Sequence, residues 1–221
     1  MKILISGYGK MGRMIEKIVL ERKLDYAGWT ENVADTDPEA ARDCICIDFT
    51  TPAAFRENYR FLAENFGAVV VGTTGWADIK DEVLSYFEKC GTPMIWASNF
   101  SIGVNAFFAL TEFLSAKLAS FGGYSPYVVE MHHCHKLDAP SGTARTLGDI
   151  VDANMGGSVD IQSVRCGEIP GIHTVGFEGL HDRLTLTHEA FSREGFAAGA
   201  VEAAVRIEGL SGVHEFKDLL L

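Results

Sequence analysis

Short apolar runs alternate with segments of helical periodicity through the first hundred residues of the chain. The runs are rich in Ile, Val and Cys and are bounded by Gly, Pro or Thr, which is typical of strands buried on both faces. We expect such strands at residues 2–6, 24–30, 44–50, 68–71 and 93–97. Between them we expect helices that end near residue 22 and that span 52–66 and 77–89. This order predicts an α/β fold, a Rossmann-like parallel sheet with helices on both faces.

The pattern changes after residue 102. A long apolar helix comes first, and the strands that follow it are mixed or alternating, as in sheets with one exposed face. We expect the helix at 104–119, strands at 127–131, 160–165 and 183–188, a helix opening at Ser141, and an alanine-rich last helix at 196–208. This second part predicts a smaller α+β arrangement.

A glycine motif follows the first expected strand. Gly7, Tyr8, Gly9, Lys10, Met11 and Gly12 read G-x-G-x-x-G, and Glu31 lies 19 residues after Gly12, at the end of the second strand. In dinucleotide-binding domains the first glycine makes a tight turn, the second admits the pyrophosphate and the third lets helix and strand pack closely. The acidic residue takes the ribose hydroxyls. The motif predicts dinucleotide binding, and the alternative is a plain β–α turn.

Two further loops follow strands of the same expected sheet. Gly72, Thr73 and Thr74 come after the fourth strand, and Ala97, Ser98, Asn99 and Phe100 come after the fifth. Ligands of open α/β sheets bind at the carboxyl ends of the strands. We therefore expect both loops to line the dinucleotide, although either composition also occurs in ordinary loops.

A second concentration of chemistry lies between residues 130 and 147. His132, His133, His135 and Lys136 lie close together, and Ser141 is a possible N-cap for the helix that begins with Gly142 and Thr143. An ammonium, imidazoles and the N–H groups of a helix start suit an anionic substrate that must receive a proton. If the strand continues past residue 131, alternation places His132, Cys134 and Lys136 on one face and His133 and His135 on the other.

A metal site is the alternative for this cluster, because His132, Cys134 and His135 are all zinc-ligand types. Continued alternation would put the Lys136 ammonium beside two of these ligands, where it would repel a metal ion. No second Cys/His cluster supplies the missing ligands at a recognisable spacing. We therefore expect no metal.

Composition narrows the class of protein. The 221 residues carry a net charge of −11, which argues against non-specific binding to nucleic acid or to anionic membranes. The five cysteines form no C-x-x-C pair, which fits reduced thiols and a cytoplasmic location. A strand begins directly at the amino terminus, so we expect no signal peptide. No apolar stretch approaches 18 residues, so we expect no membrane-spanning segment.

These residues together resemble a known family. The stretch E-M-H-H-C-H-K-L-D-A-P-S-G-T-A, from Glu130 to Ala144, closely resembles the signature of dihydrodipicolinate reductase, which acts in the diaminopimelate–lysine pathway of bacteria and plants. The similarity also covers segments spread over most of the chain in the same order, namely 7–12, 47–50, 72–75, 97–105, 187–190 and 196–200.

The resemblance implies an activity and roles for particular residues. The family reduces 4-hydroxy-tetrahydrodipicolinate with NADH or NADPH to tetrahydrodipicolinate, with loss of water. By resemblance, His132 is the acid–base group and Lys136 the proton donor. His133, Ser141, Gly142 and Thr143 would bind the dicarboxylate substrate. The three loops after the strands would line the cofactor, with Glu31 on its adenine ribose.

The change of pattern after residue 102 and the resemblance also predict the domain organisation. We expect a dinucleotide-binding domain over residues 1–102 with 195–221, and a substrate-binding and oligomerisation domain over 103–194. By resemblance, the second domain would form a homotetramer.

The chain also departs from the family pattern. It is shorter than typical members, with the shortening expected after Glu31 and around 177–181, which leaves the geometry of the tetramer open. Asn32 stands where a basic residue often supports the NADPH 2′-phosphate, which favours NADH. Cys134 stands where the family often has a basic residue. Two alternatives to the reductase are another nicotinamide oxidoreductase with the same sheet and a dinucleotide-sensing module without chemistry.

Overall fold

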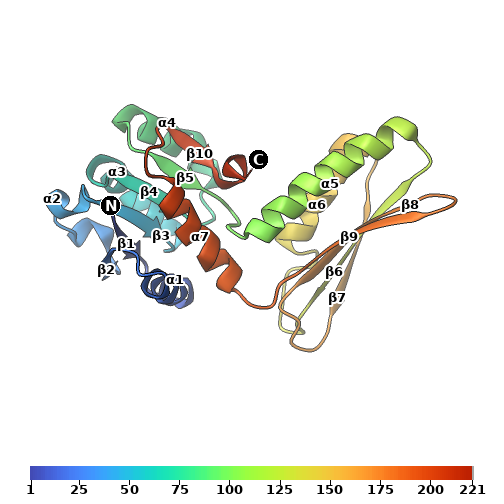
Figure 1. Cartoon of the computed structure of the whole chain (residues 1–221), viewed down its shortest axis with the longest axis horizontal. Coiled ribbons are helices and arrows are strands. Elements are labelled where there is room, and N and C mark those ends of the chain that lie inside the picture. The colour runs from blue at the N-terminus through green and yellow to red at the C-terminus, as the bar shows by residue number, and fades with distance from the viewer. Residues whose placement is uncertain (221) are drawn as a thin grey trace. The chain divides into compact units, whose positions relative to one another are not determined.

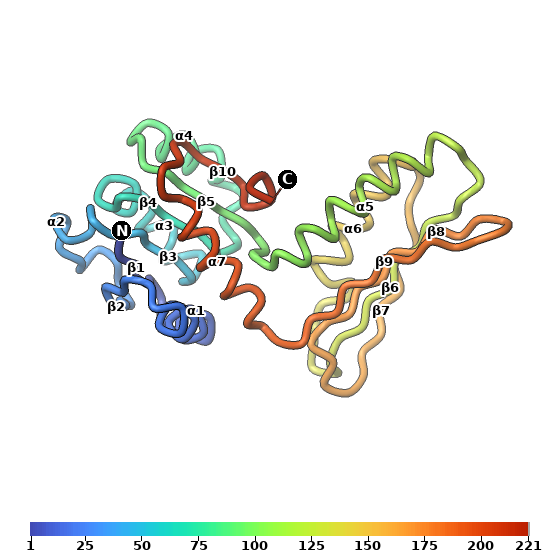
Figure 2. The backbone as a smooth tube through the Cα atoms, in the orientation of Figure 1, coloured from blue at the N-terminus to red at the C-terminus, as the bar shows by residue number. Residues whose placement is uncertain are grey.

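The computed structural model describes residues 1–220 and divides into two compact units. Unit 1 comprises Met1–Ser101 together with the chain from Glu194 onward, and unit 2 comprises Ile102–Arg193. The chain therefore leaves unit 1 once and returns to it, as the backbone trace shows (Figure 2).

Unit 1 contains a six-stranded sheet in which all strands run parallel, in the order β10-β5-β4-β3-β1-β2 (Figure 1). Its strands are β1 (Lys2–Ser6), β2 (Tyr26–Thr30), β3 (Cys44–Asp48), β4 (Ala68–Val71), β5 (Met94–Trp96) and β10 (Val213–Glu215). The five strands expected in the first hundred residues are confirmed, with ends that differ by up to two residues. The edge strand β10 was not predicted, because Val213, His214 and Glu215 form no apolar run, and only the pairing with β5 defines the strand.

Helices cover both faces of this sheet, and the alternation of side chains along each strand explains why. In β3, Ile45 and Ile47 face one core and Cys44 and Cys46 face the other. The first core is closed by α1 (Lys10–Glu21) and α7 (Glu194–Arg206). The second core is closed by α2 (Pro38–Ala41), α3 (Pro52–Asn65) and α4 (Lys80–Cys90). Short 3-10 turns complete the unit, namely η1 (Val33–Asp35), η2 (Ala77–Ile79) and η3 (Phe216–Leu219).

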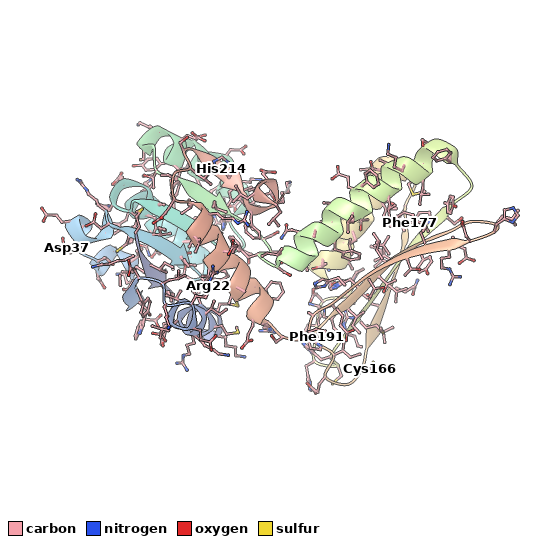
Figure 3. All side chains as sticks on the ribbon, in the orientation of Figure 1. Arg22, Asp37, Cys166, Phe177, Phe191 and His214 are labelled. Carbon is pink, nitrogen blue, oxygen red and sulfur yellow. The ribbon has the colours of Figure 1, made fainter. Side chains whose placement is uncertain are left out.

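Helix α7 returns from the far end of the sequence to support a loop of the sheet edge. A polar pair ties it to α1, with Arg22 Nη1 3.2 Å from Glu202 Oε2 (Arg22 is labelled in Figure 3). On the buried side, a Cβ added at Gly199 would lie 1.7 Å from the carbonyl oxygen of Phe100. The absence of a side chain at Gly199 is therefore what lets α7 lie against the loop that follows β5.

Unit 2 is a four-stranded sheet with two helices on one face. The order is β7-β6-β8-β9, with β7 parallel to β6 and the other neighbours antiparallel. The core lies between the sheet and the helices and includes Val128, Val175 and Phe177 (Phe177 is labelled in Figure 3). The elements are α5 (Ile102–Phe121), β6 (Ser125–His132), α6 (Gly142–Met155), β7 (Asp160–Arg165), β8 (Ile172–Glu178) and β9 (Arg183–Glu189).

Strand β8 was not predicted, and its sequence explains the omission. His173, Val175 and Phe177 are buried on the helix-facing side, so the period of two is interrupted by a buried polar residue. On the opposite face stands Gly176, a residue that disfavours strands. The ring of Tyr127 on β6 occupies the space where a side chain at Gly176 would lie. Neighbouring strands, rather than local propensity, hold this segment extended.

The strand that carries the histidines ends earlier than continued alternation would require. β6 ends at His132, and Cys134 and His135 form a turn. The turn is held by a bond from the Cys134 N–H to the carbonyl oxygen of Gly167, 3.1 Å, and from the Lys136 N–H to that of His133, 3.2 Å. The expectation that His132, Cys134 and Lys136 share one face of a strand is therefore wrong, because the chain turns after His132.

Helix α5 is long and apolar enough, by length and composition alone, to cross a membrane. This is weak evidence for a membrane span, because core helices of soluble proteins pass the same test. One side of α5 packs through Phe107 and Leu118 into the core of unit 2.

The contact between α7 and the Phe100 loop gives a stability prediction. Gly199→Ala should lower the free energy of unfolding by about 1–3 kcal/mol, because the added methyl group overlaps a backbone oxygen. Gly195→Ala in the same helix is the matched control. Its Cβ would meet only Ser101 Oγ, at 4.0 Å, and alanine should stabilise the helix by up to about 1 kcal/mol. Urea titration followed by circular dichroism measures both, and equal effects of the two variants would contradict the proposed packing constraint.

Candidate active site

The glycine motif forms the turn between β1 and α1, and each glycine has a different surrounding. Gly7 has a φ of 88°, and its Cβ would lie 2.5 Å from the carbonyl oxygen of Phe49. A Cβ at Gly12 would lie 2.2 Å from the carbonyl oxygen of Gly7, so the helix packs directly on the turn. Gly9 is the N-cap of α1, and a Cβ there would meet nothing within 4 Å. Gly7 and Gly12 are thus required by the fold, whereas Gly9 borders open space.

A buried carboxylate ties the loops of this sheet edge together. Asp48, at the end of β3, accepts hydrogen bonds from the hydroxyl groups of Ser6 (2.8 Å), Thr73 (2.6 Å) and Thr50 (3.2 Å). Burial raises the pKa of Asp48, and the hydrogen bonds from Thr73, Ser6 and Thr50 oppose that rise. Thr73 also accepts from the backbone N–H of Thr50, at 2.7 Å. One side chain therefore fixes the ends of β1, β3 and β4.

Aromatic rings continue the connection along the edge. The ring of Phe49 fills the space where a side chain at Gly72 would lie, and it lies 6.1 Å from the ring of Phe100. The Gly72–Thr74 and Ala97–Phe100 loops follow β4 and β5, which are neighbours in the sheet. The structure thus brings both predicted loops to the edge that carries the glycine turn. Sequence reasoning assigned no role to Asp48 or Phe49, although both lie in a segment that it noted.

At the end of β2 the predicted residue Glu31 is exposed. Its neighbour Asn32 caps η1, accepting a hydrogen bond from the Ala34 N–H at 3.3 Å. The rings of Tyr8 and Trp29 stack nearby, with centroids 4.2 Å apart. Glu31 therefore lies next to the glycine turn, because β1 and β2 are paired, while the Asn32 side chain is already used to cap a turn.

This edge fits a dinucleotide. The first backbone N–H groups of α1 have no intrahelical acceptor, and Gly9 provides no side-chain cap for them. Such groups, together with the helix dipole, bind the phosphates of dinucleotides. Gly9 leaves room for their approach.

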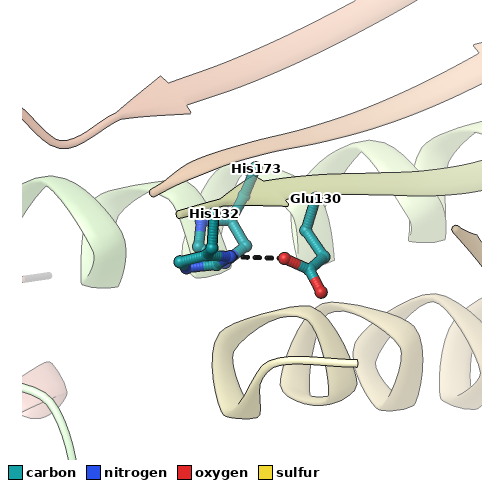
Figure 4. Close-up of side chains that lie close together, drawn as sticks. All are labelled: Glu130, His132 and His173. Atoms are coloured by element: carbon teal, nitrogen blue, oxygen red, sulfur yellow. Dashed lines mark hydrogen bonds and ion pairs between the residues drawn. The ribbon is translucent and has the colours of Figure 1, made fainter. Parts of the chain in front are cut away.

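In unit 2, polar side chains gather at one end of the helix-facing side of the sheet. Strand register brings them together, because Glu130 pairs with His173 and Ser163, His132 pairs with Arg165, and His173 pairs with His188. The rings of His132 and His173 lie edge to face with centroids 5.0 Å apart (Figure 4). This polar end of the sheet is the candidate active site of unit 2.

Glu130 is fully buried at the centre of this site. Arg165 donates to both of its oxygens, at 2.9 Å and 2.6 Å, and His132 Nδ1 is hydrogen-bonded to Oε2 (Figure 4). The backbone N–H of Ser141 donates to Oε1 at 3.2 Å. Burial by itself would raise the pKa of Glu130, but the hydrogen bonds from Arg165, Ser163 and His132 outweigh it and lower the pKa to about 2. Glu130 is therefore ionised at neutral pH.

Both imidazoles of the site are held toward their neutral form. Burial and, to a lesser extent, the positive charge of a protonated His132 lower the pKa of His173 to about 4. Burial also lowers the pKa of His132, against the hydrogen bond and charge of Glu130, which raise it. His173 Nε2 lies 3.0 Å from the Ser141 hydroxyl oxygen, which also caps α6 by accepting from the Ala144 N–H at 3.2 Å. The predicted N-cap at Ser141 is confirmed.

The other predicted residues lie on the segment between β6 and α6. Lys136 is half-buried and its Nζ lies 2.6 Å from Asp138 Oδ1. The backbone of His133 donates to the carbonyl oxygen of Ile169 at 2.8 Å. Gly142 and Thr143 form the first turn of α6, where N–H groups have no intrahelical acceptor. The structure brings His132, Ser141 and the start of α6 into one network, with Lys136 on the intervening turn.

Three contributors to this network were missed by sequence reasoning, namely Arg165, His173 and the carboxylate of Glu130. Glu130 and His132 are two residues apart on a strand, so the period of two was an available signal for their shared face. Arg165 and His173 gave no such signal, because only the pairing of β7 and β8 with β6 places them there.

Two groups in residues 1–220 bring metal-ligand atom types within 4.8 Å of one another: Glu130, His132 and His173, and separately Cys134, His135 and Glu168. In the first group the Arg165 guanidinium occupies both carboxylate oxygens, so a cation is already present. The second group is wholly exposed, and His132 does not belong to it, contrary to the cluster considered from sequence. We assign a metal to neither group.

The fold and these sites define a class of protein: an oxidoreductase with a dinucleotide-binding sheet and a separate unit that carries acid–base and anion-binding groups. Family profiles described as "Dihydrodipicolinate reductase, N-terminus" and "Dihydrodipicolinate reductase, C-terminus" match residues 1–100 and 103–220. The chain belongs to the dihydrodipicolinate reductase family, as the sequence resemblance predicted.

Two relatives align with this chain over its full length. The 4-hydroxy-tetrahydrodipicolinate reductase of Christiangramia forsetii is 37% identical and is aligned over 100% of this chain and 98% of its own length. The 4-hydroxy-tetrahydrodipicolinate reductase of Ralstonia pickettii is 36% identical over 265 positions, covering 100% of this chain and 99% of the relative. Because this chain has 221 residues, the second relative contains segments that this chain lacks.

Among solved structures, the dipicolinate-bound dihydrodipicolinate reductase from Paenisporosarcina sp. TG-14 is similar in fold, with a TM-score of 0.81. It is 20% identical in sequence, and the match covers 99% of this chain and 98% of that one. The predicted fold class, a Rossmann-like sheet with a smaller second sheet, is confirmed.

The depressed pKa of His173 predicts a pH dependence of stability. An unfolded histidine titrates near 6.5 and folded His173 near 4, so its contribution to stability is present above pH 6.5 and is lost as the pH falls through 4. Between about pH 6.5 and 4.5, the free energy of unfolding of the wild type should fall by about 2 kcal/mol more than that of His173→Gln. Urea titrations at the two pH values test this.

The control is His181→Gln, which replaces an exposed histidine between β8 and β9. It should keep the pH dependence of the wild type. An unchanged pH dependence in His173→Gln would contradict the burial of a neutral imidazole at this position.

Proposed function

We propose that this protein catalyses the NAD(P)H-dependent reduction of 4-hydroxy-tetrahydrodipicolinate to tetrahydrodipicolinate in diaminopimelate and lysine biosynthesis. Membership of the family supports the reaction. The observation that carries the proposal is the network in which His132 and the start of α6 share the carboxylate of Glu130. It joins a proton-transfer group to an anion-binding group in one rigid arrangement.

The substrate of this reaction is a dicarboxylate, and the start of α6 suits one of its carboxylates. The N–H groups of Gly142 and Thr143, with the dipole of a 14-residue helix behind them, favour a bound anion. The Lys136 ammonium and the His133 imidazole supply further donors on the adjoining turn. The bound dipicolinate named for the Paenisporosarcina enzyme is an anion of the same kind.

Reduction requires a proton as well as a hydride. NAD(P)H supplies the hydride, and the products are tetrahydrodipicolinate, water and the oxidised dinucleotide. Hydride arriving at the conjugated imine builds negative charge, which a nearby acid must neutralise. We assign that role to Lys136 as proton donor, with His132 as the acid–base group whose buried, carboxylate-paired ring can carry a proton.

The loops at the edge of the unit 1 sheet are assigned to the cofactor. Gly7–Gly12, Gly72–Thr74 and Ala97–Phe100 would line it, and Glu31 would bind the adenine ribose. The Asn32 side chain is neutral and is used to cap η1, and an acid precedes it. A 2′-phosphate would therefore find no cation at these two positions, which supports a preference for NADH.

We also propose that the protein is a cytoplasmic homotetramer that associates through unit 2. Both helices of unit 2 pack on one face of its sheet. The opposite face carries half-exposed apolar residues from β6, β7 and β8, namely Tyr127, Val129, Met131, Val164 and Ile172. Apolar side chains on a sheet face favour burial against another subunit.

The cysteines support the cytoplasmic location. All five are free thiols, as a reducing compartment requires.

The activity is tested by coupling the purified protein to a dihydrodipicolinate synthase and following nicotinamide absorbance. The wild type should turn over with both cofactors and show the higher kcat/KM with NADH. Lys136→Ala should lose about 100-fold or more in kcat because the proton donor is removed. Lys117→Ala, on the exposed side of α5, is the control and should retain activity.

Nearly intact activity of Lys136→Ala would show that the role assigned to Lys136 is wrong. Folded wild type that binds NADH but reduces no imine would favour a dinucleotide-sensing module.

The oligomer is tested by light scattering after gel filtration. Four chains of 24.1 kDa give 4 × 24.1 = 96.4 kDa for the wild type. Val129→Lys should reduce this mass, because it places a charge in the proposed interface. Leu20→Lys, at an exposed apolar position of α1, should leave the mass unchanged. A monomeric wild type at micromolar concentration would contradict the proposal.

A further inference from the structure

Glu130 is hydrogen-bonded to more elements of the candidate site than the sequence patterns predicted. Its carboxylate receives hydrogen bonds from three elements: His132 on its own strand, Arg165 on β7 and the Ser141 N–H at the start of α6. No part of its surface is exposed. A charge buried this completely is tolerated only where its partners are fixed, so Glu130 and its donors form one rigid unit.

We propose that Glu130 is a positioning residue that holds His132 in the tautomer with hydrogen on Nδ1, leaving Nε2 for proton exchange, and that also fixes the start of α6. The inference rests on the proposed function only in giving His132 an acid–base role. The tautomer itself is a property of the protein alone.

The tautomer follows from the chemistry of the pair. An ionised carboxylate is only an acceptor, so the Nδ1 atom that bonds to it must carry the hydrogen. The neutral ring then has an unprotonated Nε2, and a proton added there gives an imidazolium that Glu130 stabilises. Gly171 lies beside this nitrogen, where a Cβ would lie 3.0 Å from His132 Nε2, so a side chain at position 171 would crowd the atom that exchanges the proton.

Arg165 sets how strongly Glu130 acts on His132. It pairs with the same carboxylate, and its positive charge lowers the pKa of His132, while Glu130 raises that pKa. The other charged or titratable groups around the ring are Lys136 on the following turn and His173 on β8, with Asp138 and His188 beyond them. Removing the carboxylate and removing the guanidinium should therefore shift the titration of His132 in opposite directions.

The experiment is a ¹⁵N NMR titration of His132 in the substrate-free protein, with the signal assigned by its loss in His132→Gln. In the wild type, the neutral ring should show a protonated Nδ1 and a bare Nε2. Glu130→Gln should lower the pKa of His132 by about 1 unit and allow the other tautomer. Arg165→Met should raise the pKa by a similar amount and keep the Nδ1–H tautomer. Glu178→Gln, which breaks the exposed Glu178–Arg183 pair at the far end of the sheet, should change neither.

Shifts of the same sign in Glu130→Gln and Arg165→Met, or a wild-type ring protonated on Nε2, would overturn the inference. If Glu130→Gln fails to fold, Arg165→Met decides alone, and an unchanged titration of His132 would count against the role of Glu130. The measurement needs no substrate, so a negative result is separable from failure of the proposed reaction, which the coupled assay reports.

A kinetic readout separates positioning from a merely structural role. Glu130→Gln should lower kcat by about 100-fold and move the basic limb of the pH–rate profile toward lower pH, because the imidazolium loses its counter-ion. Glu130→Asp retains the charge. In this variant the basic limb should stay at its wild-type pH, and part of the lost kcat should be recovered. A loss of kcat with the limb unmoved would assign Glu130 to stability alone.

Discussion

A buried carboxylate at the end of a strand is the interaction on which unit 2 depends. Glu130 carries a full charge in the protein interior, where an unpaired charge is prohibitively costly, and the donors of β6, β7 and α6 together satisfy it. This requirement joins the strand that carries His132 to the start of α6, the two groups to which we assign proton transfer and binding of the substrate anion. The pairing register of β6, β7 and β8 therefore decides which side chains meet at the site.

Unit 1 also contains a buried carboxylate whose charge is satisfied by hydrogen bonds, and here it fixes the ends of three strands. Asp48 is also buried at the end of a parallel strand, but three hydroxyl groups surround it instead of an arginine. Burial therefore dominates, and the pKa of Asp48 rises where that of Glu130 falls. Asp48 holds the ends of β1, β3 and β4, and through them the loops assigned to the cofactor. Each unit thus fixes the segments that we assign to ligand binding through one carboxylate.

Packing from a distant part of the sequence completes the cofactor edge. Helix α7 closes the core beneath β1 and β3, and Gly199 lets it contact the backbone of Phe100. The last part of the chain is therefore part of unit 1, although more than ninety residues of unit 2 lie between Ser101 and α7. The loop after β5 depends on this helix for support, which local sequence around Phe100 does not reveal.

The sequence by itself determined strands β1 to β5, helices α1, α3, α4 and α7, the cap at Ser141 and the family, because buried parallel strands, amphipathic helices, N-caps and glycine turns leave local signals. Local patterns also located the histidines and the lysine, but not the end of β6 at His132 or the strand β8. Only the tertiary structure decided that Arg165, His173 and Ser141 converge on Glu130, because strand register between distant segments has no local signature. The partners of a buried charge are chosen by the fold, and the tautomer assigned to His132 follows from that choice.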